Sequence, residues 1–167
     1  RRRTASPLNW VFGGLVVQIT VDDPSREDVA ALLDEHLRSM HELSPPESVH
    51  ALDVNGLKTS GVTFWTVREG NLLLGCGALK ELGLDHGEVK SMRTPVALRR
   101  RGAGRAILEH ILGESRTRGY RRISLETGSM EAFVPARRLY ESYGFRYCGP
   151  FGDYLEDPNS MFMTLEF

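Results

Sequence analysis

Cysteine is scarce in this sequence, since the 167 residues contain only two, Cys76 and Cys148. Both lie in apolar runs without metal-ligand spacing, so we expect reduced core thiols in a cytoplasmic protein rather than disulfides. The five histidines show no spacing typical of a metal site, such as H-E-x-x-H, so we expect no metal. No apolar run approaches the roughly 18 residues that a membrane-spanning helix needs, so we expect no membrane partner.

Charge of one sign is not in excess either. The 21 lysines and arginines balance 22 acidic residues to a net charge of −1, which argues against a dedicated nucleic-acid-binding protein. Residues 99–122 contain eight arginines, but this stretch lacks the interleaved aromatic side chains of single-strand-binding surfaces, apart from Tyr120. We therefore expect no nucleic-acid partner, and interpret these arginines partly as a solvated helix face and partly as a site for an anionic ligand.

The length favours one domain. Residues 1–13, which begin with three arginines, are interpreted as a flexible basic extension because they lack the cleavage site of a signal peptide. Residues 14–167 are expected to form a single domain.

Apolar periodicity and turn residues predict the elements of this domain. Strands are expected at residues 15–21, 62–67, 72–79, 88–94, 123–126, 145–148 and 160–167. Helices are expected over residues 26–40 with Ser25 as the N-cap, over residues 46–52, and in two later segments that end near Gly119 and Gly144. This order favours an α/β (α+β) domain with a mixed, mostly antiparallel central sheet of six to seven strands and about four helices.

The most informative pattern is a turn that contains glycines, Arg99-Arg100-Arg101-Gly102-Ala103-Gly104, between a predicted strand and a predicted helix. A helix start leaves backbone N–H groups unpaired, and together with the positive end of the helix dipole these groups bind phosphates. Glycines at positions 102 and 104 let a ligand approach the backbone closely, because no Cβ stands in the way. The sequence therefore predicts a site for a cofactor that carries a diphosphate.

A second pattern follows about thirty residues later: Ala136-x-x-Leu139-Tyr140-x-x-x-Gly144-Phe145. Together with Arg99-x-x-Gly102-x-Gly104 it resembles the GCN5-related N-acetyltransferase (GNAT) family, over roughly residues 87–147. The resemblance implies a GNAT-like fold and the transfer of an acetyl group from acetyl-CoA, as co-substrate, to an amine. It also implies that the strand before the loop pairs with pantetheine and that the loop holds the diphosphate. The cofactor-binding residues implied in this way are Met92, Arg93, Thr94, Arg99, Arg100, Arg101, Gly102, Ala103, Gly104 and Arg105.

Acetyl transfer to an amine needs a base, because an amine with a pKa of about 10 must lose a proton before it attacks a thioester. The reaction also benefits from an acid near the departing thiolate. Tyr140 resembles the tyrosine acid of the family, although its place on the apolar face of a helix is also typical of core packing. Glu88 and Glu126 match positions that carry the base in relatives, and either is equally consistent with a solvated carboxylate at a strand end.

The substrate site is the least specific part of the sequence. In this fold, the acceptor amine lies between the loop after the first helices and the loop before the last strand. The resemblance therefore points to the following candidate substrate residues: His41, Ser44, Trp65, Lys80, Asp153 and Tyr154. Ordinary turn chemistry accounts for the loop residues equally well. A carboxylate such as Asp153 suits a cationic acceptor, whereas histidine or lysine groups suit an amino-acid carboxylate, and the sequence leaves both open.

We therefore expect a cytoplasmic, acetyl-CoA-dependent N-acetyltransferase that acts by direct attack in a ternary complex. The expected acceptor is a primary amine of a small molecule or an amino acid. A protein or peptide N-acetyltransferase and a catalytically inactive acyl-CoA-binding sensor module are the alternatives. A homodimer is left open, because no feature of the sequence marks an interface.

Overall fold

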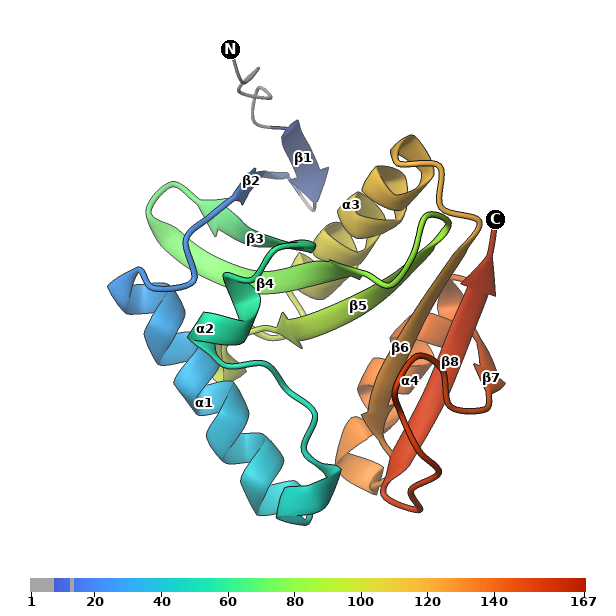
Figure 1. Cartoon of the computed structure of the whole chain (residues 1–167). Coiled ribbons are helices and arrows are strands. Elements are labelled where there is room, and N and C mark those ends of the chain that lie inside the picture. Colours follow the sequence, from blue (N-terminus) through green and yellow to red (C-terminus); the bar gives the residue numbers. More distant parts are fainter. Residues whose placement is uncertain (1–7, 13) are drawn as a thin grey trace.

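One sheet of eight strands organises the protein, and the computed structural model describes residues 8–12 and 14–167. The strands lie in the order β1-β2-β3-β4-β5-β6-β8-β7 (Figure 1). Their bounds are β1 Leu8–Phe12, β2 Leu15–Val21, β3 Val62–Glu69, β4 Leu72–Glu81, β5 His86–Arg93, β6 Arg122–Gly128, β7 Arg146–Cys148 and β8 Ser160–Glu166. Every neighbouring pair is antiparallel except β5 and β6. The predicted mixed, mostly antiparallel α/β fold is confirmed.

The eighth strand corrects the predicted N-terminal extension. Leu8–Phe12 were expected to be flexible, but they form β1, which pairs with β2 from Leu8 opposite Ile19 to Phe12 opposite Leu15. The apolar run over residues 8–17 contains two strands that fold back on each other near Gly14, whose φ of +86° suits a glycine. Residues 1–7 and 13 of the predicted extension lie outside the described residues.

Helices cover both faces of the sheet (Figure 1). Their bounds are α1 Glu27–Leu43, α2 Val54–Leu57, α3 Ala103–Thr117 and α4 Val134–Ser142, with short 3₁₀ turns η1 Pro46–Ser48, η2 Val96–Leu98 and η3 Glu131–Phe133. Helices α1 and α2 pack on one face over a core that includes Leu33 and Phe64. Helices α3 and α4 pack on the other face over a larger core that includes Ile107 and Leu125. None of the described helices is long and apolar enough to cross a membrane.

Two local predictions are wrong. Cys76 is buried as expected, but Cys148 is exposed, because β7 is a short edge strand whose three residues are all exposed. Helix α1 begins at Glu27 with Arg26 as the N-cap, and neither Arg26 nor Ser25 caps it with a side chain. The Ser25 backbone and hydroxyl instead donate to Asp23 in the preceding turn, so this serine stabilises the turn rather than the helix.

The position of the site follows from a defect in the sheet. Strands β5 and β6 pair through three residue pairs, from His86 opposite Arg122 to Glu88 opposite Ser124, and no further pairs join them within the described residues. Strand β5 also carries an irregularity against β4, where Ser91 has a φ of +55°. Such a bulge increases the local twist and bends the strand. As a result β5 turns away from β6, and a gap opens between them toward α1 and α4.

Candidate functional site

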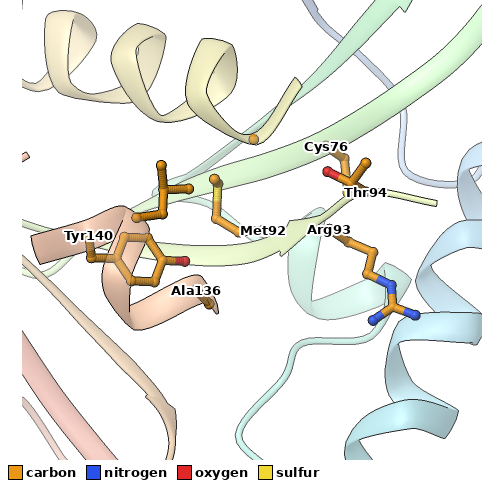
Figure 2. A pocket seen from close by; sticks show the side chains of 8 residues that line it. Cys76, Met92, Arg93, Thr94, Ala136 and Tyr140 are labelled. Atoms are coloured by element: carbon orange, nitrogen blue, oxygen red, sulfur yellow. The ribbon is translucent and has the colours of Figure 1, made fainter. Parts of the chain in front are cut away.

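A cleft of about 710 Å³ occupies the gap between β5 and β6. The segments that line it are α1, η1, β5, the start of α3, β6, η3 and α4. Figure 2 shows the narrow part between β5 and α4, where the hydroxyl of Tyr140 points toward Met92 and the side chain of Arg93 runs away from them. The cleft is therefore a passage from the start of α3, past Tyr140, to the region between α1 and the end of β6.

The start of α3, where the sequence predicts an anionic-ligand site, lies at one end of this passage. Arg100 and Gly102 both have left-handed backbone angles, with φ of +65° and +86°, and they turn the chain sharply into the helix. The hydrogen bond that opens the helical pattern is donated by the Ala106 N–H to the Gly102 carbonyl. The N–H groups of residues 103–105 have no acceptor among the described residues, so they are free to bind a phosphate.

Gly104 leaves room for that ligand. A Cβ placed there would meet Leu139 at 3.7 Å and Thr94 at 4.0 Å, which is ordinary contact. The fold therefore does not need glycine at this position, whereas a ligand that approaches the helix start does. Around it, the side chains of Arg99, Arg100 and Arg105 line the cleft, and Arg101 does not.

Strand β5 supplies the wall that the sequence assigns to pantetheine. Met92, Arg93 and Thr94 all line the cleft. The guanidinium of Arg93 donates to Glu35 at 2.9 Å and to Ser39 at 3.1 Å, both on α1. Beyond Glu88, no described residue of β6 pairs with β5, so the edge of β5 that faces the gap presents its backbone. The residues predicted to hold the cofactor thus lie together, apart from Arg101, and their role in binding stays a prediction.

Tyr140 satisfies both interpretations of its sequence position. It is buried in the core, with its ring 5.7 Å from that of Phe145, and it also lines the cleft. Burial raises its pKa well above the ordinary value, and the carboxylate of Glu126 adds to the rise. The hydroxyl therefore keeps its proton at neutral pH, which a proton donor requires.

Glu126 lies on the opposite side of the gap, at the end of β6. It lines the cleft, and burial raises its pKa to about 7. The nearby carboxylate of Glu88 adds to this rise, while the ammonium of Lys90 opposes it. A carboxyl group with a pKa near the working pH is suited to accept a proton, since it is both ionised and basic there.

Glu88, the other candidate base, lies in a different environment from Glu126. Its side chain is 2% exposed and does not line the cleft. It accepts hydrogen bonds from the Lys90 ammonium at 3.2 Å and from the Tyr154 hydroxyl, and Lys90 also donates to that hydroxyl at 2.9 Å. Glu88 is therefore the buried carboxylate of an ion pair with Lys90, whereas Glu126 faces the cleft.

The candidate substrate residues are only partly brought together. Ser44 lines the cleft, and Tyr154 stands behind it against Glu88. His41, Lys80 and Asp153 do not line it. Trp65 does not line it either: it is 3% exposed on the α3 face of the sheet, with its ring 5.3 Å from that of His110, because strand alternation directs it into the larger core.

Several cleft residues were missed by sequence reasoning. Lys90 follows Glu88 by two residues on β5, so period-two alternation could have placed it on the same face. His36 and Ser91 also line the cleft. No short-range signal points to these two, because helix packing and the bulge bring them in. Within the part of the chain that the structure describes, no cluster of three or more His, Cys, Asp or Glu could hold a metal ion.

A sheet that splays beside a helix start with free N–H groups, with Tyr140 and Glu126 lining the gap, is the site to compare with known proteins. The sequence pattern of the acetyltransferase (GNAT) family matches residues 29–145. The chain belongs to this family and is an acetyltransferase.

Relatives agree over nearly the full chain. It is 55% identical over 148 residues to a protein of Bacillus subtilis (strain 168) named "Uncharacterized N-acetyltransferase YsnE", covering 89% of this chain and 98% of that protein. It is 48% identical over 147 residues to "Uncharacterized N-acetyltransferase YedL" of Escherichia coli (strain K12), covering 88% and 92%. The fold matches a GNAT family acetyltransferase from Elizabethkingia anophelis with acetyl-CoA bound, with a TM-score of 0.63 at 16% identity, covering 90% of this chain and 98% of that one.

Proposed function

We propose that this protein transfers the acetyl group of acetyl-CoA to a primary amine of a small molecule or an amino acid, by direct attack in a ternary complex. One observation carries the proposal: a single cleft joins the free N–H groups at the start of α3 to Tyr140 and Glu126. The first end suits a diphosphate, and the second end offers a proton donor and a proton acceptor. The family and the acetyl-CoA-bound structural relative support the same cofactor.

Each of the two side chains has one task. The thioester supplies an activated acetyl group. Glu126 accepts a proton from the acceptor ammonium, so that the nitrogen lone pair can attack the thioester carbonyl carbon. A C–N bond forms and the C–S bond breaks, and the electron pair of that bond leaves with sulfur. The nitrogen releases its second proton to solvent as the amide forms. Tyr140 then donates its phenolic proton to the thiolate, and solvent restores the protonation states of both residues.

The walls of the cleft favour a small acceptor. The whole cleft of about 710 Å³ would hold acetyl-CoA and the acceptor together, so only part of it is left for the acceptor. On the side away from α3, the end of α1 and η1 form a wall with Ser44, Ser48 and His50. Because helix and loop segments enclose this end, a folded protein surface fits it less well than a free amine.

Calorimetric titration with acetyl-CoA tests the cofactor site. We expect micromolar binding by the wild type and no detectable heat for Gly104→Glu, since a carboxylate would then occupy the phosphate position. Gly113→Glu is the matched control, because Gly113 lies on the exposed side of the same helix with nothing within 4 Å of a Cβ. Absence of binding by folded wild-type protein would overturn the proposal.

Turnover is then measured over a panel of amines and short peptides by release of free CoA. Acetylation of a free amine, with peptides poorer by at least about tenfold, supports a small acceptor. Preference for peptides would favour the protein N-acetyltransferase alternative. Binding of acetyl-CoA without turnover on any acceptor would contradict the transfer step and favour an acyl-CoA sensor.

A further inference from the structure

The acceptor end of the cleft carries positive charge on one wall. Away from the start of α3, the charged side chains that line the cleft are Lys90 and Arg93 on β5 and Glu126 on β6. Glu126 is the only carboxylate among all the described lining residues. Each cation is paired with a carboxylate that does not line the cleft, Lys90 with Glu88 and Arg93 with Glu35, so a bound acceptor would lie nearer the cations than their partners.

The two cations differ in how completely their hydrogen bonds are used. The ammonium of Lys90 donates to Glu88 and to Tyr154, so a buried ion pair holds it. The side chain of Arg93 is 9% exposed, and its terminal Nη2 donates to Glu35 and Ser39. Its Nε is buried and has no partner. Arg93 thus keeps an unused donor beside the cleft.

Two neutral groups on the same wall are also without partners. Ser91 is 8% exposed, sits on the bulge of β5, and its buried hydroxyl makes no hydrogen bond. The Nδ1 of His36 on α1 is likewise buried and unpartnered. Burial and the positive charge of Arg93 lower the pKa of His36 to about 4, so this imidazole is neutral at pH 7 and can donate from Nδ1.

Several buried side-chain polar atoms of the described residues have no partner, and those of His36, Ser91 and Arg93 belong to residues that line this cleft. An unmet donor of this kind needs an explanation. A bound group with two acceptor oxygens and a negative charge has the chemistry that these three donors lack. A carboxylate has this chemistry, since it accepts hydrogen bonds on both oxygens and matches the planar guanidinium.

We propose that the acceptor amine carries a carboxylate, and that this carboxylate binds on the β5–α1 wall at Arg93, with Ser91 and His36 as neutral hydrogen-bond partners. The inference rests on the proposed function and narrows its substrate class to amino acids and related amino carboxylates. The amine of such an acceptor then lies toward Glu126, across the gap from the carboxylate site.

The test measures binding of reaction products, so that it does not depend on turnover. N-acetyl derivatives of a panel of α- and ω-amino acids, and the matching N-acetyl amino-acid amides, are titrated into the full-length protein with and without CoA. We expect at least one acid to bind with a Kd at least about tenfold lower than its amide, as charge-assisted hydrogen bonds imply. Equal binding of acids and amides, tighter binding of amides, or no binding of any acid would overturn the inference.

Two variants separate binding from a structural role of Arg93. Arg93→Gln removes the guanidinium, and we expect the preference for acids over amides to disappear. Glu35→Ala combined with Ser39→Ala removes both hydrogen bonds from Arg93 to α1 but keeps the cation, so we expect the preference to remain at wild-type size or larger. If both variants lose the preference equally, Arg93 only anchors α1 and the inference fails.

The outcomes also separate the inference from the proposed function. Binding of acids to a protein that transfers no acetyl group would refute the function and leave the carboxylate site intact. If amino acids and the matching amino-acid amides are acetylated equally well, the function is supported and the carboxylate site is refuted. If Arg93→Gln does not fold, the comparison of acids with amides on the wild type decides the question.

Discussion

Replacing Glu126 by glutamine should slow catalysis and stabilise the fold at the same time. Glu126 is a carboxyl group at the end of β6 that lines the cleft, and burial is the main reason for its raised pKa. If it is the base, its loss should lower kcat by about 10²- to 10⁴-fold. Because an ionised carboxylate is costly to bury, the variant should also unfold less readily wherever Glu126 of the wild type is charged.

The size of the second effect follows from the pKa. The folded-state value is about 7, against 4.5 for an unperturbed glutamate. One unit corresponds to about 1.4 kcal/mol, so ionising Glu126 in the folded state costs on the order of 3 kcal/mol. Since the folded-state pKa is the higher one, the cost is nearly absent below pH 4.5, grows between the two values, and is fully present above pH 7.

The assay is thermal or urea unfolding at pH 5 and pH 8, together with kcat/KM across the same range. Solvent in the cleft screens part of the cost, so we expect Glu126→Gln to gain about 2 kcal/mol on the wild type between pH 5 and pH 8. For a chain of this size, that is a rise in relative Tm of about 4–8 °C. Wild-type kcat/KM should rise with pH through about 7, and the variant should lack this step.

Three results would refute the reasoning. A variant with wild-type kcat and the same pH profile would show that Glu126 is not the base. A variant that is less stable at pH 8 would show that the carboxylate makes favourable contacts that outweigh its burial. A gain that is the same at both pH values would show that ionisation is not its cause. Glu131→Gln, an exposed glutamate on η3, is the control for a change of net charge.

Further variants test other parts of the site. Tyr140→Phe should lower kcat by about 10²- to 10⁴-fold while acetyl-CoA affinity measured by calorimetry stays within about threefold, because only a proton donor is lost. Lys90→Met should cost about 3 kcal/mol in urea unfolding, because it leaves Glu88 buried without its cation. Gly128→Ala should cost about 1–3 kcal/mol in the same assay, because the new Cβ would stand 2.3 Å from the ring of Phe133.

Each of these has a contradicting result. A Tyr140→Phe variant with wild-type kcat would leave Tyr140 as a core residue only. If Lys90→Met combined with Glu88→Gln is no more stable than Lys90→Met alone, the ion pair is not what holds Glu88 in the interior. Gly149→Ala, where nothing lies within 4 Å of a Cβ, is the control for Gly128 and should leave the urea midpoint unchanged.

The parts of the site that depend on local sequence could be predicted. The turn into α3 needs left-handed backbone at Gly102 and free N–H groups just after it, and both are properties of neighbouring residues. Tyr140 was placed on the correct helix and the correct face for the same reason. The order and type of the later strands also followed from period-two patterns.

Predictions that depended on pairing between distant segments were less successful. Alternation placed Trp65 on a predicted strand, but it could not tell which face of the sheet covers the cleft. The two candidate bases looked equivalent in the sequence, and only tertiary packing separates the enclosed Glu88 from the accessible Glu126. Strand β1 was not predicted because its partner, β2, is the adjacent half of the same apolar run. The two strands of this hairpin therefore looked like one segment.

The short ladder between β5 and β6 divides the sheet into two parts that few residue pairs join. Three residue pairs connect these strands, and the gap begins directly beyond them. On one side lie β1 to β5 with α1 to α3, and on the other lie β6 to β8 with α4. A chain-like ligand with its own amide groups, laid along the open edge of β5, would act there as a substitute strand. The acyl donor would then be a structural element as well as a reactant, and its binding would stiffen the domain where β5 and β6 part.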